Sequence, residues 1–172
     1  IFGINAELII DPVFILEKSK WNKLAENSNC NNKNKIATYI FHPTNKHKKV
    51  YKYLSKKYNA KVVELEKFNV SPETWLSTIK NCKFLVTSSF HGMCFAIIFN
   101  KPFICISNKS KGSARFDSIC EMLEIENQCI DSIDEIYQRD CIFKIDYEKV
   151  DQRIKEEQKK GLNYLKKVLE AP

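Results

Sequence analysis

The chain has 172 residues, 44% of them apolar and 28% charged; these values are typical of a globular protein and argue against a disordered segment, a collagen-like fibre or a small disulfide-bonded scaffold. Its net charge of +7 favours anionic partners such as phosphates or acidic glycans, but the lysines are scattered and no nucleic-acid-binding motif accompanies them, so no nucleic-acid partner is expected. No apolar stretch approaches the roughly 18 residues that cross a bilayer, so no transmembrane segment is expected.

Short apolar runs alternate with amphipathic segments along the chain. From the N-terminus, strands are predicted at 7–10, 36–41, 61–65, 83–87 and 102–106, with short candidates at 129–130 and 141–145. Helices are predicted over 17–27, after a cap at Thr44 or Asn45, after a cap at Ser71, over 93–99, around 116–123 and over 147–170.

This alternation predicts an α/β fold, with a Rossmann-like parallel sheet and helices on both faces. In such sheets, ligands bind outside the carboxyl ends of the strands, near the point where the strand order reverses. The loops to search for a site are therefore those that lead from a strand to a helix, at 42–45, 66–71, 88–92 and 107–115.

The strongest candidate is the sequence SSFHG at 88–92, between a predicted buried strand and a predicted helix. The first N–H groups of a helix are unpaired and carry partial positive charge, so this turn is suited to bind an anion. Ser88 and Ser89 add hydroxyl groups, and the imidazole of His91 is suited to move a proton or to pair with a phosphate. A helix cap or a packing role is the alternative for His91.

A second candidate is the basic loop KSKGSAR at 109–115, which leaves the next predicted strand. Neighbouring parallel strands end at the same edge of a sheet, so this loop is expected beside His91. Lys109, Lys111 and Arg115 are suited to clamp a phosphate or a carboxylate, Arg115 in bidentate fashion. The alternative is a solvated loop in which Ser113 caps the next helix.

Two further polar residues follow predicted strands. Asp11 follows the strand at 7–10 and is a candidate to touch a sugar hydroxyl, and His42 follows the strand at 36–41 and is a candidate to face the same cleft. The alternative for both is a turn or cap role. His47 lies on the apolar face of its predicted helix and is expected to be structural.

The seven cysteines lie mostly within apolar patterns, and no two are spaced as C-x2-C. This pattern favours buried thiols in a reducing compartment. A metal site needs clustered ligands, and the closely spaced His91 and Cys94 have no second pair, so no metal is expected.

Three stretches of the sequence carry a family resemblance: DPVFIL followed by a Trp near the start, SPETWLSTIKNCKFLVTSSFHGMCFAIIFNKPF, and a basic loop that ends in R-F-x-S-I. Together they resemble the polysaccharide pyruvyl transferase family over most of 7–125, most closely over 71–103. The resemblance implies a fold similar to one half of a two-domain GT-B glycosyltransferase.

In that case residues 1–172 would be a single Rossmann-like domain, the C-terminal half of a longer two-domain protein, closed by the amphipathic helix at 147–170. The first residue is Ile1 and not methionine, which fits a piece of a longer chain. The missing N-terminal domain would then be a partner. A GT-B-like active site lies between two domains, so the chain alone is expected to be inactive.

The resemblance implies transfer of pyruvate from phosphoenolpyruvate to a sugar of a bacterial surface polysaccharide, with formation of a ketal and without a cofactor. By position, His91 is the histidine of the family motif, Lys111 is the basic residue about twenty positions later, and Arg115 matches an arginine at the start of a helix. Some members place an arginine two residues before the histidine, where this chain has Ser89. The resemblance also implies a cytoplasmic location; peripheral association with the inner membrane, where glycan precursors are made, is the alternative.

Two other hypotheses stay open. The first alternative is the nucleotide-sugar-binding half of a GT-B glycosyltransferase; the basic, not acidic, loop after the SSFHG turn counts against it. Ser89 and the absent first domain favour instead a non-catalytic α/β binding domain.

Overall fold

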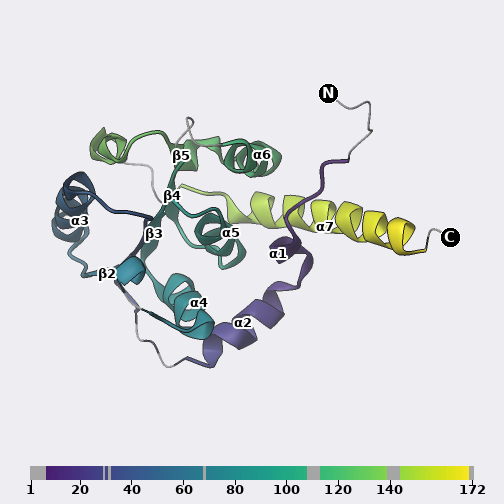
Figure 1. Ribbon diagram of the computed structural model, residues 1–172, viewed down its shortest axis with the longest axis horizontal. Helices are drawn as coiled ribbons and strands as arrows, with labels where there is room; N and C mark the ends of the chain where they lie inside the picture. The colour runs from purple at the N-terminus through teal and green to yellow at the C-terminus, as the bar shows by residue number, and fades with distance from the viewer. Residues whose placement is uncertain are drawn as a thin grey trace.

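Five short strands form one parallel sheet in the order β2-β1-β3-β4-β5 (Figure 1). They are β1 (Ile36–Tyr39), β2 (Val62–Glu64), β3 (Phe84–Thr87), β4 (Phe103–Ile106) and β5 (Cys129–Ile130). The computed structural model describes residues 7–28, 30, 32–67, 69–107, 113–138 and 144–170. The α/β fold with a Rossmann-like parallel sheet, predicted from the sequence, is confirmed.

Helices cover both faces of this sheet. The α-helices are α1 (Pro12–Ile15), α2 (Lys18–Glu26), α3 (Asn45–Tyr58), α4 (Pro72–Asn81), α5 (Phe90–Ile98), α6 (Ala114–Leu123) and α7 (Tyr147–Leu169). Single 3-10 turns or short 3-10 helices are η1 (Leu65–Lys67), η3 (Glu126–Gln128) and η4 (Ile133–Gln138). Helix α3 and η4 pack on one face, and the other α-helices lie on the opposite side (Figure 1).

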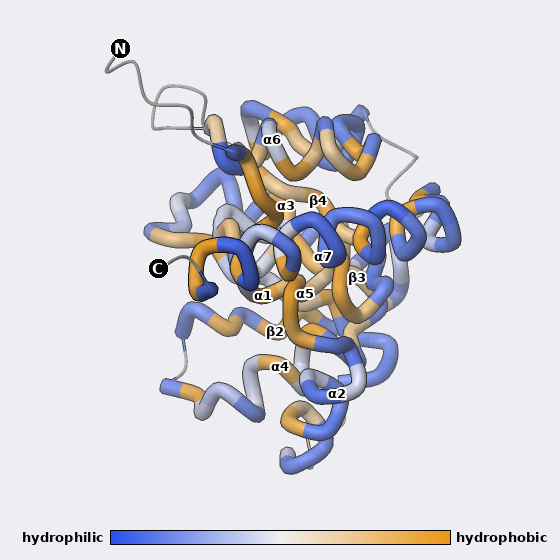
Figure 2. The backbone as a smooth tube through the Cα atoms, turned by 90° about the vertical axis from the view of Figure 1, so that its right-hand side faces the viewer, coloured by the Kyte–Doolittle hydropathy of each residue, from blue (hydrophilic) through white to orange (hydrophobic). Residues whose placement is uncertain are grey.

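The central strands β1, β3 and β4 are mostly apolar because both of their faces are buried. Along β3, Phe84 and Val86 join the core under α3, whereas Leu85 joins the core under α4 and α5. This alternation follows from the period of two in a strand, and burial on both sides explains the continuous apolar runs in the sequence. Figure 2 shows the result: apolar segments of α5, β3 and β4 lie inside, and hydrophilic turns of α7 lie outside.

The strand order reverses between β1 and β3. From β1 the chain moves outward to β2, and from β3 it moves in the opposite direction to β4 and β5. In parallel sheets of this kind, ligands usually bind outside the carboxyl ends of the strands, at such a reversal point. The loops at this point contain His42 and the SSFHG turn.

The expected strand at 7–10 is wrong. These residues belong to no strand, and the short helix α1 follows them, with Asp11 as its N-cap. Ile10 is buried, whereas Leu8 is 74% exposed. A four-residue apolar run does not distinguish a strand from an extended segment that packs on helices, and here Ile10 packs in the core next to α7. The short strand candidate at 141–145 lies mostly outside the described residues, and its last two residues are not in a strand.

Helix α7 packs its first half on the rest of the fold. Its buried residues are Val150, Ile154 and Gly161, and the Tyr147 hydroxyl donates a hydrogen bond to the carbonyl of Lys101. Beyond Gly161 the apolar face continues, but Leu162, Leu165, Val168 and Leu169 are exposed. Within the described part of the chain, no helix is both long enough and apolar enough to cross a membrane.

Candidate functional site

The turn between β3 and α5 is built by a chain of hydrogen bonds. The Thr87 hydroxyl donates to the carbonyl of Tyr39 at 2.8 Å and accepts from the Ser89 N–H at 3.0 Å. The Ser89 hydroxyl oxygen then accepts from the Gly92 N–H at 3.2 Å, as expected of an N-cap. These bonds join the end of β3 to the end of β1 and fix the direction in which α5 starts.

Gly92 is required by this packing. A Cβ atom at position 92 would lie 2.5 Å from the Thr87 hydroxyl oxygen and 3.3 Å from Ser89 Cβ. Both neighbours are held by the hydrogen bonds described above, so neither can move away without breaking the turn. The glycine of the SSFHG sequence therefore serves close packing of the helix on the strand end.

The start of α5 offers backbone N–H groups to a ligand. Gly92 and Met93 donate to Ser89, but the N–H groups of Phe90 and His91 have no acceptor among the described residues, as is usual at a helix start. The His91 side chain is exposed at the same point, directly after the central strand. An anion at this helix end would meet N–H groups, the positive end of the helix dipole and an imidazole.

Ser88 and Ser89 have different roles in the turn. The Ser88 hydroxyl accepts from the Phe41 N–H at 3.0 Å, so it ties the loop after β1 to the loop after β3. Ser89 is buried and its hydroxyl is engaged in the helix cap. Contact of either serine with a substrate stays a prediction.

Arg115 stands over the aromatic ring that also touches His91. Its guanidinium carbon lies 5.0 Å from the centre of the Phe90 ring, and the Phe90 and His91 ring centres are 5.6 Å apart. Arg115 is exposed and forms no ion pair with any residue that the structure describes. Phe90 thus holds the Arg115 guanidinium on the same side of the fold as the start of α5. The sequence did not predict this contact.

Asp11 and Arg115 line one cavity of about 400 Å³, together with Phe90 and the apolar side chains of Ile10 and Met122. The Asp11 carboxylate accepts the Val13 N–H at 3.0 Å as the N-cap of α1. The structure therefore brings Asp11 close to the basic residue, although the strand that was expected to position it does not form.

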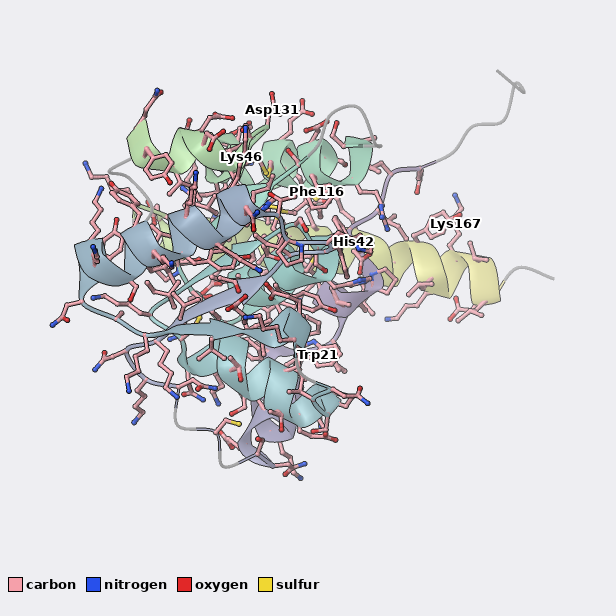
Figure 3. The ribbon with its side chains drawn as sticks, turned by 60° about the vertical axis from the view of Figure 1, so that its left-hand side comes forward. Trp21, His42, Lys46, Phe116, Asp131 and Lys167 are labelled. Carbon is pink, nitrogen blue, oxygen red and sulfur yellow. The ribbon has the colours of Figure 1, made fainter. Side chains whose placement is uncertain are left out.

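His42 lies at the carboxyl end of β1, exposed, with a positive φ of 56°. Figure 3 shows it near the start of α3, not far from Lys46. The left-handed backbone turns the chain sharply from β1 into α3, which is the turn role considered as its alternative. No described hydrogen bond or ring contact joins His42 to His91, and His42 does not line the cavity of Asp11 and Arg115.

Lys109 and Lys111 lie outside the described residues, so their predicted role in binding stays a prediction. Cys94, three residues after His91, is fully buried, and burial raises the pKa of its thiol. Cys94 therefore remains protonated and is no nucleophile for His91 to activate. Among the residues that the structure describes, no three His, Cys, Asp or Glu side chains are grouped so that they could hold a metal ion.

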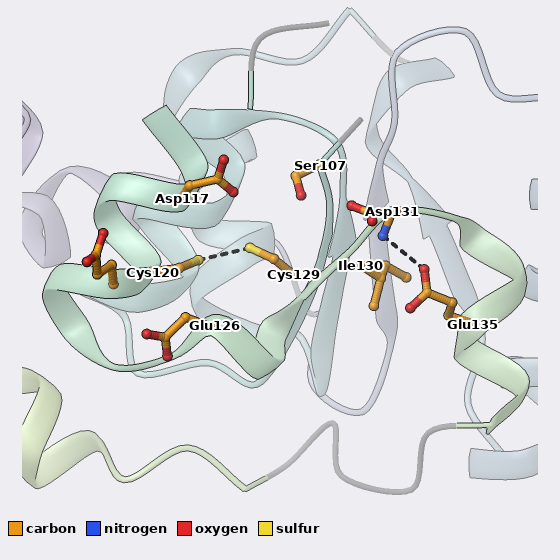
Figure 4. Close-up of a pocket in the computed structure, with 9 residues that line it drawn as sticks. Ser107, Asp117, Cys120, Glu126, Cys129, Ile130, Asp131 and Glu135 are labelled. Carbon is orange, nitrogen blue, oxygen red and sulfur yellow. Dashed lines mark hydrogen bonds between the residues drawn. The ribbon is translucent and has the colours of Figure 1, made fainter. Parts of the chain in front are cut away.

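A second cavity of about 520 Å³ lies beyond this site, at the carboxyl ends of β4 and β5 (Figure 4). Its lining combines carboxylates with two thiols: Ser107, Asp117, Cys120, Glu121, Glu126, Cys129, Ile130, Asp131 and Glu135. The sequence analysis did not single out this cluster, because its members come from α6, η3, β5, η4 and the chain after β4. Only the positions of Ser107 and Asp131 directly after strands could have indicated it.

A comparison with known families gives one match: the model described as polysaccharide pyruvyl transferase matches residues 1–110, which include β1 to β4 and the SSFHG turn. No curated protein and no solved structure matches this chain.

Proposed function

Because this chain belongs to the polysaccharide pyruvyl transferase family, we propose that it binds phosphoenolpyruvate and helps to transfer its pyruvyl group to a sugar of a polysaccharide, with formation of a ketal. The observation that carries the proposal is the arrangement at the reversal point of the sheet. His91, the open N–H groups of α5 and the guanidinium of Arg115 all lie around Phe90.

Phosphoenolpyruvate carries a phosphate and a carboxylate, and this arrangement offers a donor to each. The start of α5 suits the phosphate, because its N–H groups and helix dipole both favour negative charge. Arg115 suits a planar anion such as the carboxylate, since its guanidinium forms two parallel hydrogen bonds. Position 89 carries a serine and not an arginine, and Arg115 is the arginine that contacts Phe90 of this turn.

The proposed reaction starts with a proton transfer to C3 of the enol double bond, which makes C2 electrophilic. A sugar hydroxyl then forms a bond to C2 and loses its proton, the C2–O bond to phosphate breaks, and a second hydroxyl closes the ketal as it also loses a proton. His91 is the residue proposed to move the proton, and it is exposed where the anion would bind. Arg115 and the α5 N–H groups would stabilise the negative charge on the departing phosphate.

Replacement of His91 by Asn tests the proton-transfer role. Loss of general acid–base catalysis typically lowers a rate by about 10²- to 10⁴-fold, so release of phosphate from phosphoenolpyruvate by the complete protein, with glycan acceptors present, should fall by that order. The affinity for phosphoenolpyruvate should change much less than the rate.

Lys20→Ala, on the exposed face of α2, is the matched control and should release phosphate like the parent. If His91→Asn retains the parental rate, His91 is not the proton-transfer group. If the complete protein instead binds a nucleoside diphosphate sugar and releases no phosphate from phosphoenolpyruvate, the glycosyltransferase hypothesis replaces the proposed function.

A further inference from the structure

Three thiols from three different elements meet beside the acidic cavity at the ends of β4 and β5. Cys105 lies in β4, Cys120 in α6 and Cys129 in β5. The sulfur atoms of Cys120 and Cys129 are 2.9 Å apart, as the dashed line in Figure 4 shows. Cys105 and Cys129 are register partners in the two neighbouring parallel strands.

The cavity gives a small molecule access to this pair. Cys120 and Cys129 both line it, and Cys129 is the more exposed of the two, since Cys120 is only 1% exposed. Ser107 is only 2% exposed, and its side chain also points into the cavity (Figure 4). Five residues with carboxylate side chains line the cavity: Asp117, Glu121, Glu126, Asp131 and Glu135.

We propose that Cys120 and Cys129 are a modification site that forms an intrachain disulfide by exchange with a small disulfide, and that the acidic cavity selects a cationic one. The proposal rests on the geometry of this cavity and is independent of the proposed transferase function.

Distance and access to the cavity both favour the Cys120–Cys129 bond. A disulfide bond is about 2.05 Å long, so the two sulfur atoms have to approach each other by less than ~1 Å. Cys105 also contacts Cys129, but it is fully buried and does not line the cavity. A reagent in the cavity therefore has access to Cys120 and Cys129 and not to Cys105.

The exchange balances in two steps. The Cys129 sulfur, as a thiolate, attacks one sulfur of the small disulfide, so a mixed disulfide forms and one small thiolate leaves. The Cys120 sulfur, as a thiolate, then attacks Cys129 Sγ, which forms the intrachain bond and expels the second small thiolate. The two protons of the protein thiols end on the two small thiols. The protein pair is oxidised by two electrons and the small disulfide is reduced by two.

The order of the steps follows from the surroundings of the two sulfurs. Contact with Cys129 and burial raise the pKa of the Cys120 thiol, so Cys120 keeps its proton while Cys129 is reduced. Cys129 lies toward the cavity and meets the reagent first. Once Cys129 is in a mixed disulfide it no longer bears a negative charge beside Cys120, and the second attack becomes easier.

The charge preference follows from the carboxylates. Cystamine carries two positive charges, whereas oxidised glutathione has a net negative charge. At low salt we expect cystamine to react with this pair on the order of tenfold faster than glutathione disulfide does, relative to the rates with a thiol in a neutral peptide. The double variant Glu121→Gln/Glu126→Gln should reduce this preference, and added salt should do the same.

Peptide mapping of the complete protein tests the pairing. The sequence between Cys120 and Cys129 contains no Lys or Arg but contains Glu121, Glu124 and Glu126. After treatment with cystamine and alkylation, the tryptic peptide with both cysteines should be two hydrogen atoms lighter than its reduced form. Cleavage after glutamate should leave two fragments joined by the disulfide. The bond should raise the melting temperature by roughly 5–10 °C, since it closes a loop of about ten residues.

Single variants separate the two steps. Cys120→Ser should stop the reaction at a stable adduct on Cys129, and Cys129→Ser should give no product at this site. Cys82→Ser, at a buried thiol before β3, is the control and should form the disulfide like the parent. Alanine replacements at 120 and 129 serve as a second pair, with melting temperatures measured first to show that each variant is folded.

Three results would overturn the proposal. The first is that the folded parent forms no disulfide and no adduct at these residues with cystamine, oxidised glutathione or the neutral bis(2-hydroxyethyl) disulfide. The second is a bond between Cys105 and Cys129 in place of Cys120 and Cys129. The third, which overturns the charge selection, is an equal normalised rate for cystamine and oxidised glutathione at low salt.

Discussion

Gly92 is the residue on which the geometry of the candidate site depends most directly. Thr87 and Ser89 enclose its α-carbon, and both are fixed by hydrogen bonds that also set the direction of α5. A side chain at this position would push the helix start away from the strand end, where His91 is presented. The small residue thus links local packing to the position of the proposed catalytic group.

Gly92→Ala should therefore lower the free energy of unfolding, by about 1–3 kcal/mol for an overpacked site. Gly161→Ala is the matched control, because the one atom that its new Cβ would approach too closely is Ile15 Cδ1, at 2.7 Å, and that side chain can rotate. The control should be neutral or slightly stabilising, since alanine favours a helix by about 1 kcal/mol over glycine. Urea unfolding of both variants measures the difference; equal effects would mean that the turn tolerates a Cβ.

At the scale of single elements, α3 begins with a capping box that has a histidine, His47, at the third helical position. His47 Nδ1 accepts the Thr44 N–H at 3.0 Å, so the imidazole takes the place that Glu or Gln usually has. Desolvation lowers the pKa of His47, although Glu66 and Asp134 partly oppose this. A protonated Nδ1 cannot accept a hydrogen bond, so the cap requires the neutral ring.

Because the pKa of His47 is lower in the folded protein than in the unfolded chain, the unfolded chain binds the proton more tightly. The contribution of this residue to stability is therefore present above the unfolded pKa of about 6.5, and it is lost as the pH falls through the folded value. His47→Gln keeps an acceptor but does not titrate. Its free energy of unfolding should fall less than that of the parent between pH 7.5 and pH 5, as measured by urea unfolding; an identical pH dependence would contradict the role of His47.

Most of the elements could be predicted from the sequence because their causes are local. Burial on both faces produces the continuous apolar runs of β1 and β3, and caps such as Ser71, which accepts the Thr74 N–H, mark where helices begin. The segment at 7–10 was predicted wrongly because Ile10 packs against helices that are distant in the sequence, whereas Leu8 is exposed. Helix α1 has only four residues, too few for a periodic pattern.

The candidate site could be predicted only in part. The SSFHG turn was identified because a strand end, a helix start and a histidine are adjacent in the sequence. The contact of Arg115 with Phe90 and the pairing of Cys120 with Cys129 could not be identified, because each joins segments whose distance depends on how the helices pack on the sheet. The number of residues between two such segments does not show whether they come into contact.

At the scale of the whole molecule, α7 changes character along its length. Its first half closes the fold: Asn100 donates to Asp151 at 3.0 Å, and Arg153 pairs with Glu124 at the end of α6. Its second half extends from the fold with exposed leucines (Figure 1). The two halves should therefore contribute differently to stability.

Ile154→Ala should lower the free energy of unfolding by about 2–4 kcal/mol, because this side chain is only 9% exposed. Leu165→Ala, on the same helix but 40% exposed, should cost less than about 1 kcal/mol in this chain. Thermal or urea unfolding of both variants provides the comparison. An equally large loss for Leu165→Ala would show that its side chain is covered in solution, contrary to the exposure described.

The central claim is that the reversal point of the sheet binds the anionic donor through Arg115 and the start of α5. The most direct test is a calorimetric titration of the complete protein with phosphoenolpyruvate, in the parent and in Arg115→Lys, Arg115→Ala and Lys20→Ala. Loss of a charged hydrogen bond costs roughly 1.5–3 kcal/mol, so Arg115→Ala should bind about 10- to 100-fold more weakly. Arg115→Lys should lie between it and the parent, because it keeps the charge but loses the bidentate geometry, and Lys20→Ala should match the parent. Parental affinity in Arg115→Ala would contradict the claim.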